Sequence, residues 1–319
     1  MRLLITGGFG YLGGRLAQYC ASKMGCEILL GSRTQVESPP WLKEARVVQT
    51  FWSSPAELEE SCAGVDAVVH MAGVNASDCA ADPVGALVTN GVGTACLLEA
   101  SIRQGVKRFI YLSTAQVYGN PLMGEISEKT PPSTNHPYAT SHLAGEAAVQ
   151  YKHQQGEIFG LTIRLSNTFG APAHKDANCW MLLANDLCWQ AVTKQKMVLR
   201  SSGMQRRDFI PLTDVCGAIH HLLHLAEKDI YKNVFNLGGA WAPTVWDFAC
   251  LVQERCKVVL GFEPSLSRLA QEAGKADHNF DYCIDALLQT GFSPEFNRVS
   301  EIDQLLDFCQ EVSFSPNDN

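Results

Sequence analysis

A glycine-rich turn near the start of the chain constrains its fold more than any other feature. The apolar residues 3–5 predict a short buried strand, and the amphipathic residues 11–21 predict a helix. The turn between them fits G-x-G-x-x-G with one extra glycine in front: Gly7, Gly8, Gly10 and Gly13. Such glycines permit the tight turn, the approach of a pyrophosphate to the backbone, and close packing of helix on strand. The turn therefore predicts that dinucleotide phosphates bind at the N-terminus of the first helix, where free N–H groups favour an anion.

Predicted strands and helices alternate along the chain beyond this turn. Strands are predicted over residues 26–30, 45–51, 65–73, 109–112, 160–165 and 234–237, and helices over residues 55–62, 90–104, 138–154 and 215–226. Residues 171–200 are predicted to be irregular and then helical. This alternation predicts an α/β fold, a Rossmann-type doubly wound parallel sheet with a smaller, mostly helical C-terminal substrate domain.

We expect the dinucleotide-binding domain to cover residues 1–166 and 205–240. The substrate-binding domain is expected over residues 167–204 and 241–319. Ligands of such sheets bind beyond the C-terminal ends of the strands. The turn at residues 113–119 is therefore the expected place for chemistry.

Charge and cysteine usage narrow the class of protein. The net charge of −8 provides no basic surface for nucleic acid or for an anionic membrane. Glycines break the N-terminal apolar run, which is therefore neither a signal peptide nor a membrane span. None of the 12 cysteines has C-x-x-C spacing, and several lie in apolar runs, so we expect free thiols in a reducing cytosol. A cytoplasmic protein without nucleic-acid or membrane partners is expected.

The residues after the second predicted strand bear on the choice of cofactor. An NAD-binding fold places Asp or Glu about twenty residues past the glycines to bind the ribose 2′-hydroxyl. This chain has Ser32 and Arg33 there. A hydroxyl and a guanidinium suit a 2′-phosphate, so the sequence favours NADP, with NAD as the alternative. Arg33 could instead be a solvated loop charge that stacks on adenine.

Several further motifs follow in order along nearly the whole chain. They are Thr6-Gly7-Gly8, His70-Met71-Ala72-Gly73, Asn90 with Gly93-Thr94, Ser113-Thr114 with Val117-Tyr118-Gly119, Pro137-Tyr138, Arg164 with Asn167, Arg207-Asp208-Phe209, and Asn236-Leu237-Gly238. Together they resemble the extended branch of the short-chain dehydrogenase/reductase family. The resemblance is to its NAD(P)-dependent sugar-nucleotide epimerases, dehydratases and reductases. It implies a nucleotide-sugar substrate and a homodimer formed through the helices at residues 90–104 and 138–154.

The same resemblance implies the roles of individual residues. Tyr138 matches the family's acid/base tyrosine, and Thr114 matches the residue that hydrogen-bonds the same substrate oxygen. Asn167 and Arg207 are expected to bind the nucleotide diphosphate of the substrate. The implied cofactor-binding residues are Gly7, Gly10, Tyr11, Leu12, Gly13, Ser32, Arg33, Met71, Ala72, Gly73, Asn90, Tyr138 and His142.

One departure from the family pattern concerns catalysis directly. The family has Tyr-x-x-x-Lys, whereas this chain has His142 one helical turn after Tyr138. The lysine hydrogen-bonds the nicotinamide ribose, and its charge lowers the pKa of the tyrosine. Histidine is mostly neutral at pH 7, with an unperturbed pKa near ~6.5, and supplies little of that charge. An NAD(P)-binding protein with little or no catalysis is therefore the alternative hypothesis.

Two other features exclude particular chemistries. Dehydratases of the family carry an acidic pair after the position of Thr114, whereas this chain has Ala115 and Gln116. That difference favours an epimerase or reductase. Three histidines lie together near residue 222, namely His220, His221 and His224. No carboxylate or cysteine is spaced to complete a ligand set, so we expect no metal site.

Overall fold

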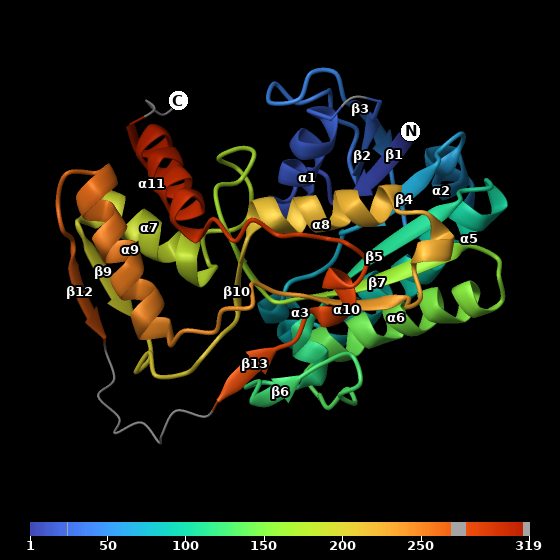
Figure 1. Cartoon of the computed structure of the whole chain (residues 1–319). Helices are drawn as coiled ribbons and strands as arrows, with labels where there is room; N and C mark the ends of the chain where they lie inside the picture. The colour runs from blue at the N-terminus through green and yellow to red at the C-terminus, as the bar shows by residue number, and fades with distance from the viewer. Residues whose placement is uncertain (24, 269–278, 315–319) are drawn as a thin grey trace.

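A seven-stranded parallel sheet forms the centre of the larger lobe (Figure 1). The computed structural model describes residues 1–319 except 24, 269–278 and 315–319. The strands are β1 (Arg2–Thr6), β2 (Glu27–Ser32), β3 (Arg46–Gln49), β4 (Ala67–His70), β5 (Arg108–Thr114), β7 (Phe159–Leu165) and β11 (Val234–Leu237). Their order across the sheet is β11-β7-β5-β4-β1-β2-β3. The order in which successive strands are added therefore reverses between β1 and β4. This arrangement confirms the predicted doubly wound fold.

Helices cover both faces of the sheet, as the alternation along the first strand requires. Leu3 and Ile5 point to the face covered by α1 (Tyr11–Ala21) and α8 (Leu212–His224). Leu4 points to the opposite face, where it shares a core with α2 (Pro55–Cys62) and α5 (Thr94–Arg103). Long α6 (Pro137–Gln154) lies on that second face, against β5 and β7 (Figure 1). Successive residues of a strand face opposite ways, so one short apolar run contributes to two cores.

A smaller lobe carries most of the C-terminal third. Helices α7 (Leu183–Lys194), α9 (Val245–Val259) and α11 (Arg298–Phe314) pack around a core of their own (Figure 1). Besides these helices, β9 (Lys196–Leu199) pairs in parallel with β12 (Ser265–Arg268), a pair that the sequence did not predict. The predicted domain boundaries stay a prediction, and part of the range 241–319 lies outside the described residues.

Short elements join the two lobes. Two small parallel pairs are formed by β8 (Asn167–Phe169) with β10 (Phe209–Pro211), and by β6 (Gly124–Ile126) with β13 (Phe280–Tyr282). Other short helical segments are α3 (Ala76–Ala81), α10 (Asp285–Leu288) and the 3-10 turns Ala115–Tyr118 and Glu227–Asp229. The first of these turns follows β5 directly, and it fixes the backbone around Thr114.

The helix predicted to start at Asn90 starts earlier, so that prediction was wrong. It begins as α4 (Pro83–Ala86), continues as the π-helical segment Leu87–Gly93, and ends as α5. Asp82 caps it, because its Oδ1 accepts a hydrogen bond of 2.9 Å from the N–H of Gly85, and Pro83 occupies the first position. Among the described helices, Pro83–Arg103 is long and apolar enough to cross a membrane, and half of the window tested is buried in the protein.

Candidate active site

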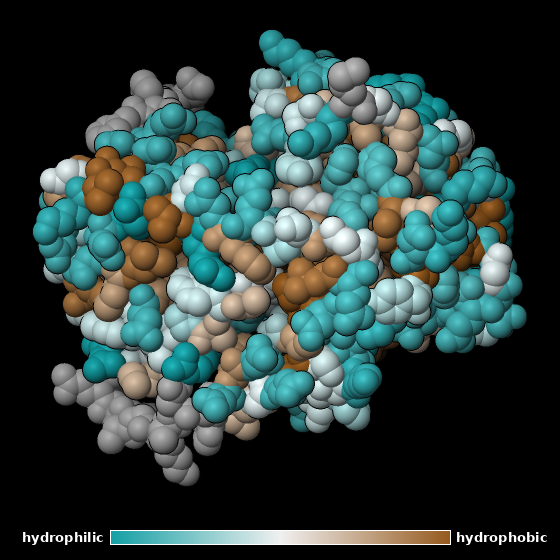
Figure 2. Space-filling view, viewed as in Figure 1, coloured by the Kyte–Doolittle hydropathy of each residue, from teal (hydrophilic) through white to brown (hydrophobic). Residues whose placement is uncertain are grey.

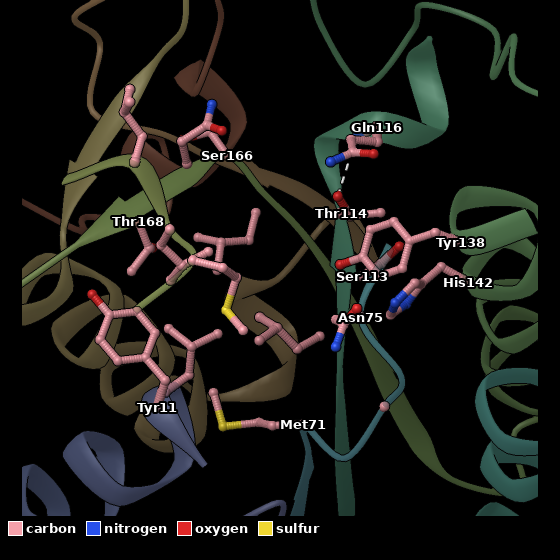
Figure 3. Close-up of a pocket in the computed structure, with 18 of the residues that line it drawn as sticks. Tyr11, Met71, Asn75, Ser113, Thr114, Gln116, Tyr138, His142, Ser166 and Thr168 are labelled. Carbon is pink, nitrogen blue, oxygen red and sulfur yellow. Dashed lines mark hydrogen bonds between the residues drawn. The ribbon is translucent and has the colours of Figure 1, made fainter. Parts of the chain in front are cut away.

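A cavity of about 420 Å³ opens at the C-terminal ends of the central strands (Figure 3). It lies where the strand order reverses, which is the usual ligand site of doubly wound sheets. The sheet lobe contributes Tyr11, Met71, Thr114 and Tyr138, and the chain beyond β7 contributes Asn167 and Arg207. The structure therefore brings together predicted residues that lie far apart in the sequence.

The glycine turn forms one end of this site. Gly7 has a φ of +71°, and a Cβ there would lie 2.9 Å from the backbone nitrogen of Ala72. A Cβ on Gly13 would collide with the carbonyl oxygen of Gly7. The N-cap Gly10 supplies no side-chain hydrogen bond, and the first turn of α1 holds no acidic residue. The helix thus leaves its first N–H groups for an anion, and the turn fits the pyrophosphate of a dinucleotide.

Ser32 and Arg33 lie at the C-terminal end of β2 and do not line the 420 Å³ cavity. The Ser32 hydroxyl accepts a hydrogen bond of 3.2 Å from the N–H of Thr34. The Arg33 side chain is exposed, and it forms no ion pair among the described residues. Because β2 pairs with β1 next to the glycine turn, both residues are on the edge where a dinucleotide's adenosine half would lie. Their roles stay predictions.

Some of the residues after β4 line the cavity, and others pack behind its wall. Met71 and Gly73 line the cavity, whereas Ala72 packs its backbone beneath Gly7. Asn90 is buried behind them. Its Oδ1 accepts a hydrogen bond of 2.9 Å from the N–H of Val74, and its Nδ2 donates one of 3.0 Å to Oγ of Ser141. Asn90 thus ties this loop to α6, while its predicted contact with the cofactor stays a prediction.

Thr114 and Tyr138 project into the cavity from β5 and α6 (Figure 3). Thr114 is the last residue of its strand, and its Oγ1 accepts a hydrogen bond of 3.2 Å from the N–H of Gln116. Tyr138 lies in the first turn of α6, after Pro137. Burial raises the pKa of Tyr138, and its hydrogen bond with Thr114 opposes that shift. The pair can therefore hold one substrate oxygen between a threonine hydroxyl and a phenol.

His142 lies one helical turn further along α6, edge to face with Tyr138 at 4.7 Å between ring centroids. Its Nδ1 is 2.9 Å from Oη of Tyr111. Burial lowers the pKa of His142 to about 4, so the imidazole is neutral at pH 7. The position predicted from the helical spacing therefore holds a hydrogen-bonding group without the charge that a lysine would bring.

Asn167 and Arg207 lie on the far side of the cavity. The Nδ2 of Asn167 donates a hydrogen bond of 2.9 Å to the carbonyl oxygen of Asp208. Arg207 is exposed, and within the described part of the chain it has no acidic partner. It also lines a second cavity of about 330 Å³, which extends along α7 and β9 into the smaller lobe. Arg207 therefore lines both cavities as a cation that forms no ion pair with the described residues.

A buried ion pair beneath Thr114 was not predicted. The Ser113 hydroxyl donates a hydrogen bond of 2.6 Å to Oε1 of Glu146, and Arg164 binds the other oxygen of that carboxylate at 2.6 Å. Glu146 lies four residues after His142, which in turn lies four residues after Tyr138. This spacing places all three on one face of α6 and was the signal that could have identified Glu146.

Two of the three histidines of α8 form hydrogen bonds within the protein. His221 contacts the Thr290 hydroxyl at 2.9 Å, and His224 contacts the carbonyl oxygen of His220 at 2.9 Å. Across the described residues, no group of three or more His, Cys, Asp or Glu could hold a metal ion. The structure describes the 12 cysteines as free, most of them buried.

The chain is similar to known enzymes that act on nucleotide sugars. It is 25% identical to the dTDP-glucose 4,6-dehydratase of Streptomyces niveus, over 96% of this chain and 91% of that protein. It is 31% identical to the dTDP-glucose 4,6-dehydratase of Mycolicibacterium smegmatis, over 70% of this chain and 69% of that one. The fold resembles UDP-glucuronic acid 4-epimerase from Bacillus cereus, solved with UDP-glucuronic acid and NAD. That likeness has a TM-score of 0.79 at 21% identity and covers 98% of this chain and 100% of that one.

A family model, described as the NAD-dependent epimerase/dehydratase family, matches residues 3–238. The match runs from β1 to the turn after β11, and so spans the glycine turn, Thr114, Tyr138 and Arg207. It confirms the family predicted from the motifs, and with it an enzyme of this type. The chain belongs to the NAD-dependent epimerase/dehydratase family.

Proposed function

We propose that this protein transfers a hydride between a nicotinamide cofactor and a nucleotide-linked sugar, as an epimerase or a reductase. The observation that carries the proposal is the meeting of Thr114, Tyr138 and the glycine-turn helix at one cavity. The named relatives, which act on dTDP- and UDP-sugars, support the substrate class.

The chain's own residues have distinct parts in this mechanism. When bound, the nicotinamide accepts or donates the hydride, and its oxidised form brings a positive charge to the site. Tyr138 takes the proton of the reacting sugar hydroxyl and returns it in the reverse step. Thr114 donates a hydrogen bond to the same oxygen and holds it beside the phenol. Burial raises the pKa of Tyr138, so a nearby positive charge is needed to favour the phenolate at neutral pH.

The lining of the cavity argues against elimination of water from the sugar. A carboxyl pair would have to act as acid and base there. No Asp or Glu lines the 420 Å³ cavity among the described residues. Gln116, which does line it, cannot exchange a proton at neutral pH. We therefore propose epimerisation or reduction, although some relatives are dehydratases.

Two arginines, Arg207 and Arg33, support the proposal that the substrate carries a diphosphate and that the cofactor is NADP. Arg207 lies where the two cavities meet, so a substrate that fills both would lay its diphosphate against the guanidinium. Arg33 and Ser32 at the end of β2 favour the 2′-phosphate of NADP over the 2′-hydroxyl of NAD. If NAD binds more tightly than NADP in calorimetric titrations, this assignment of Arg33 is wrong.

The neutral His142 favours a second candidate function, a protein that binds NAD(P) without turning over substrate. Turnover of a panel of UDP-, GDP- and dTDP-sugars, with NAD and with NADP, separates the two. We expect Tyr138→Phe to lower kcat by about 10²–10⁴-fold, the usual contribution of a general acid or base. The same change at Tyr151, an exposed tyrosine of α6, is the matched control and should leave kcat unchanged.

The variant His142→Lys restores the charge that the family pattern supplies, and we expect it to raise kcat. If neither the natural protein nor His142→Lys turns over any sugar while both bind cofactor, the enzymatic proposal fails. A gain of activity in His142→Lys that Tyr138→Phe abolishes would exclude the binding-only candidate.

We also propose that the protein is a homodimer and that it is cytoplasmic, the location that its free cysteines favour. Support for the dimer comes from a row of apolar side chains on the helix Pro83–Arg103. Val84, Val88 and Val92 follow one another at intervals of four residues and are each more than half exposed. This helix packs against α6, whose Tyr151 is exposed as well.

A further inference from the structure

A chain of buried hydroxyl and imidazole groups lies beneath the cavity and has no part in the mechanism above. It runs from Thr6 on β1 through His70 on β4 to Thr94 on α5. Beside it, Tyr111 on β5 reaches Nδ1 of His142 at 2.9 Å. All of these side chains are buried. Because each group has few partners, the positions of its protons follow from the groups that can only donate or only accept.

The hydrogen bonds at Thr6, at one end of this series of buried groups, fix the tautomer of His70. The backbone N–H groups of Met71 and Ala72 can only donate, and they lie 3.2 and 3.3 Å from Oγ1 of Thr6. The Thr6 hydroxyl therefore gives its own proton to Nδ1 of His70, at 2.6 Å. Burial lowers the pKa of His70 to about 3, so its ring is neutral, and its single proton is on Nε2.

The hydrogen bonds at Thr94, at the other end of the series, have their directions fixed in the same way. Nε2 of His70 donates to Oγ1 of Thr94 at 3.0 Å. The Thr94 hydroxyl in turn donates to the carbonyl oxygen of Asn90, a pure acceptor, at 2.6 Å. That carbonyl is 3.5 Å from Oη of Tyr111, too long for more than a weak hydrogen bond. Oγ1 of Thr94 also forms a hydrogen bond with Tyr111, but it already accepts the proton of Nε2 of His70. The phenol proton of Tyr111 therefore has its best acceptor in Nδ1 of His142, at 2.9 Å.

We propose that Tyr111 holds His142 in the tautomer that carries its proton on Nε2. His142 then presents a hydrogen-bond donor to the cavity, directed at an oxygen of the bound cofactor. His142 lines the cavity, and its Nε2 has no hydrogen-bond partner in the described part of the chain. Its Cε1 side faces Gly73, another residue of the cavity wall.

This tautomer gives His142 one of the two properties of a lysine. It offers an N–H donor one helical turn from Tyr138, but no charge. The opposite tautomer would present a lone pair, which could accept a proton from a ribose hydroxyl but could not donate to it as a lysine does. Tyr111 is therefore a positioning residue that acts through His142. Its contribution to turnover rests on the proposed function, whereas the tautomer and cofactor binding do not.

The tautomer is tested directly by nitrogen NMR of the full-length protein labelled with ¹⁵N-histidine. The variant His142→Gln removes one ring and so assigns the signals of His142. At neutral pH we expect a protonated, pyrrole-like Nε2 and a bare, pyridine-like Nδ1. In Tyr111→Phe this pattern should give way to the other tautomer or to a mixture. A proton on Nδ1 in the natural protein, or an unchanged pattern in Tyr111→Phe, overturns the proposal.

Cofactor affinity supplies the second readout, measured by calorimetry with NAD and with NADP. We expect Tyr111→Phe to weaken the better-bound cofactor by about five- to tenfold, the value of one neutral hydrogen bond. In the His142→Gln background the same change should have no effect, because an amide offers its N–H donors without help from Tyr111. An equal loss in both backgrounds would mean that Tyr111 acts by packing alone, and would overturn the proposal.

The control is Tyr231→Phe, which removes a phenol that is bound to Gln289, a residue that does not line the cavity. It should change neither the His142 signals nor the affinity. These measurements need no turnover, so a failure of the proposed enzymatic function would not obscure them. If the protein turns over a nucleotide sugar, Tyr111→Phe should also raise KM for the cofactor more than it lowers kcat.

Discussion

His70 and His142 place two neutral imidazoles beneath the cavity, and their burial links stability to pH. Burial lowers the pKa of His142 to about 4 and, together with the neighbouring His142, lowers that of His70 to about 3. In the unfolded chain both have a pKa near ~6.5. Below that value the unfolded state binds protons that the native state excludes. The contribution of these two rings to the free energy of unfolding is therefore complete above about pH 6.5. It is lost as the pH falls toward about 4.

We expect His142→Gln to remove part of this acid sensitivity. Between about pH 7.5 and about pH 5, the displaced pKa of His142 costs the natural protein roughly 2 kcal/mol of unfolding free energy. Urea unfolding of both proteins at the two pH values measures the difference. Carboxylates titrate in both proteins, so their contribution cancels. An equal loss of stability in the two proteins would contradict the pKa assigned to His142.

At the scale of single residues, the family resemblance identified Tyr138, and the helical spacing placed His142 on the same face, but neither identified their partners. Glu146 continues the same spacing, yet a carboxylate on a helix is usually exposed. Only the fold places Arg164 of β7 against it. Tyr111 is similar, because its role depends on α6 lying across β5. The contact of Asn90 with the cofactor stays a prediction, whereas the hydrogen bonds of its amide to Val74 and Ser141 were not predicted.

At the scale of elements, the glycine turn and α1 form the least tolerant junction of the site. A Cβ at Gly13 would collide with the carbonyl oxygen of Gly7 and lie 2.9 Å from Cα of Gly8. Both are backbone atoms and cannot move aside without opening the turn. We expect Gly13→Ala to lower stability by about 1–3 kcal/mol and to weaken dinucleotide binding at least about tenfold.

The matched control for this change is Gly217→Ala in α8, on the same face of the sheet. A Cβ there would meet only side-chain atoms, at 3.6 Å from Tyr19 and 3.7 Å from Phe292. Alanine is the better helix former, so stability should rise by up to about 1 kcal/mol with cofactor binding unchanged. Calorimetry and chemical unfolding measure both quantities. If Gly13→Ala behaves like Gly217→Ala, the turn is not the close junction that the structure describes.

Elements with strong local patterns were predictable, and those that depend on distant partners were not. The sheet strands and α1, α2 and α6 were predicted close to their observed bounds. The start of the helix at Pro83 was missed because Val, Gly and Thr between residues 84 and 93 are weak helix formers. Packing against α6 overrides that preference. The strands β9 and β12 were missed because each is short and pairs only with the other, far along the chain.

At the scale of the whole molecule, the two lobes meet at the cavity and each supplies part of its wall. Tyr138 comes from the sheet lobe, whereas Leu183 and Ala184 come from the start of α7. The face in Figure 2 is mostly hydrophilic, with smaller apolar patches over the smaller lobe and near the centre. The sequence predicted the sheet lobe in detail, but the walls from residues 171–200 depend on how the smaller lobe packs.

The exposed valines of the helix Pro83–Arg103 provide the test of the proposed dimer. Side chains this exposed in a row of three form an apolar stripe that a second copy of the chain would cover. We expect the double variant Val88→Glu and Val92→Glu to convert a dimer into a monomer, because it would bury like charges at a two-fold interface. Light scattering coupled to size-exclusion chromatography gives the mass. The control is Val258→Glu on α9, where a single valine is 63% exposed outside any such row, and the mass should not change. A monomeric natural protein, or a dimer that survives the double variant, would show that this stripe does not hold two copies together.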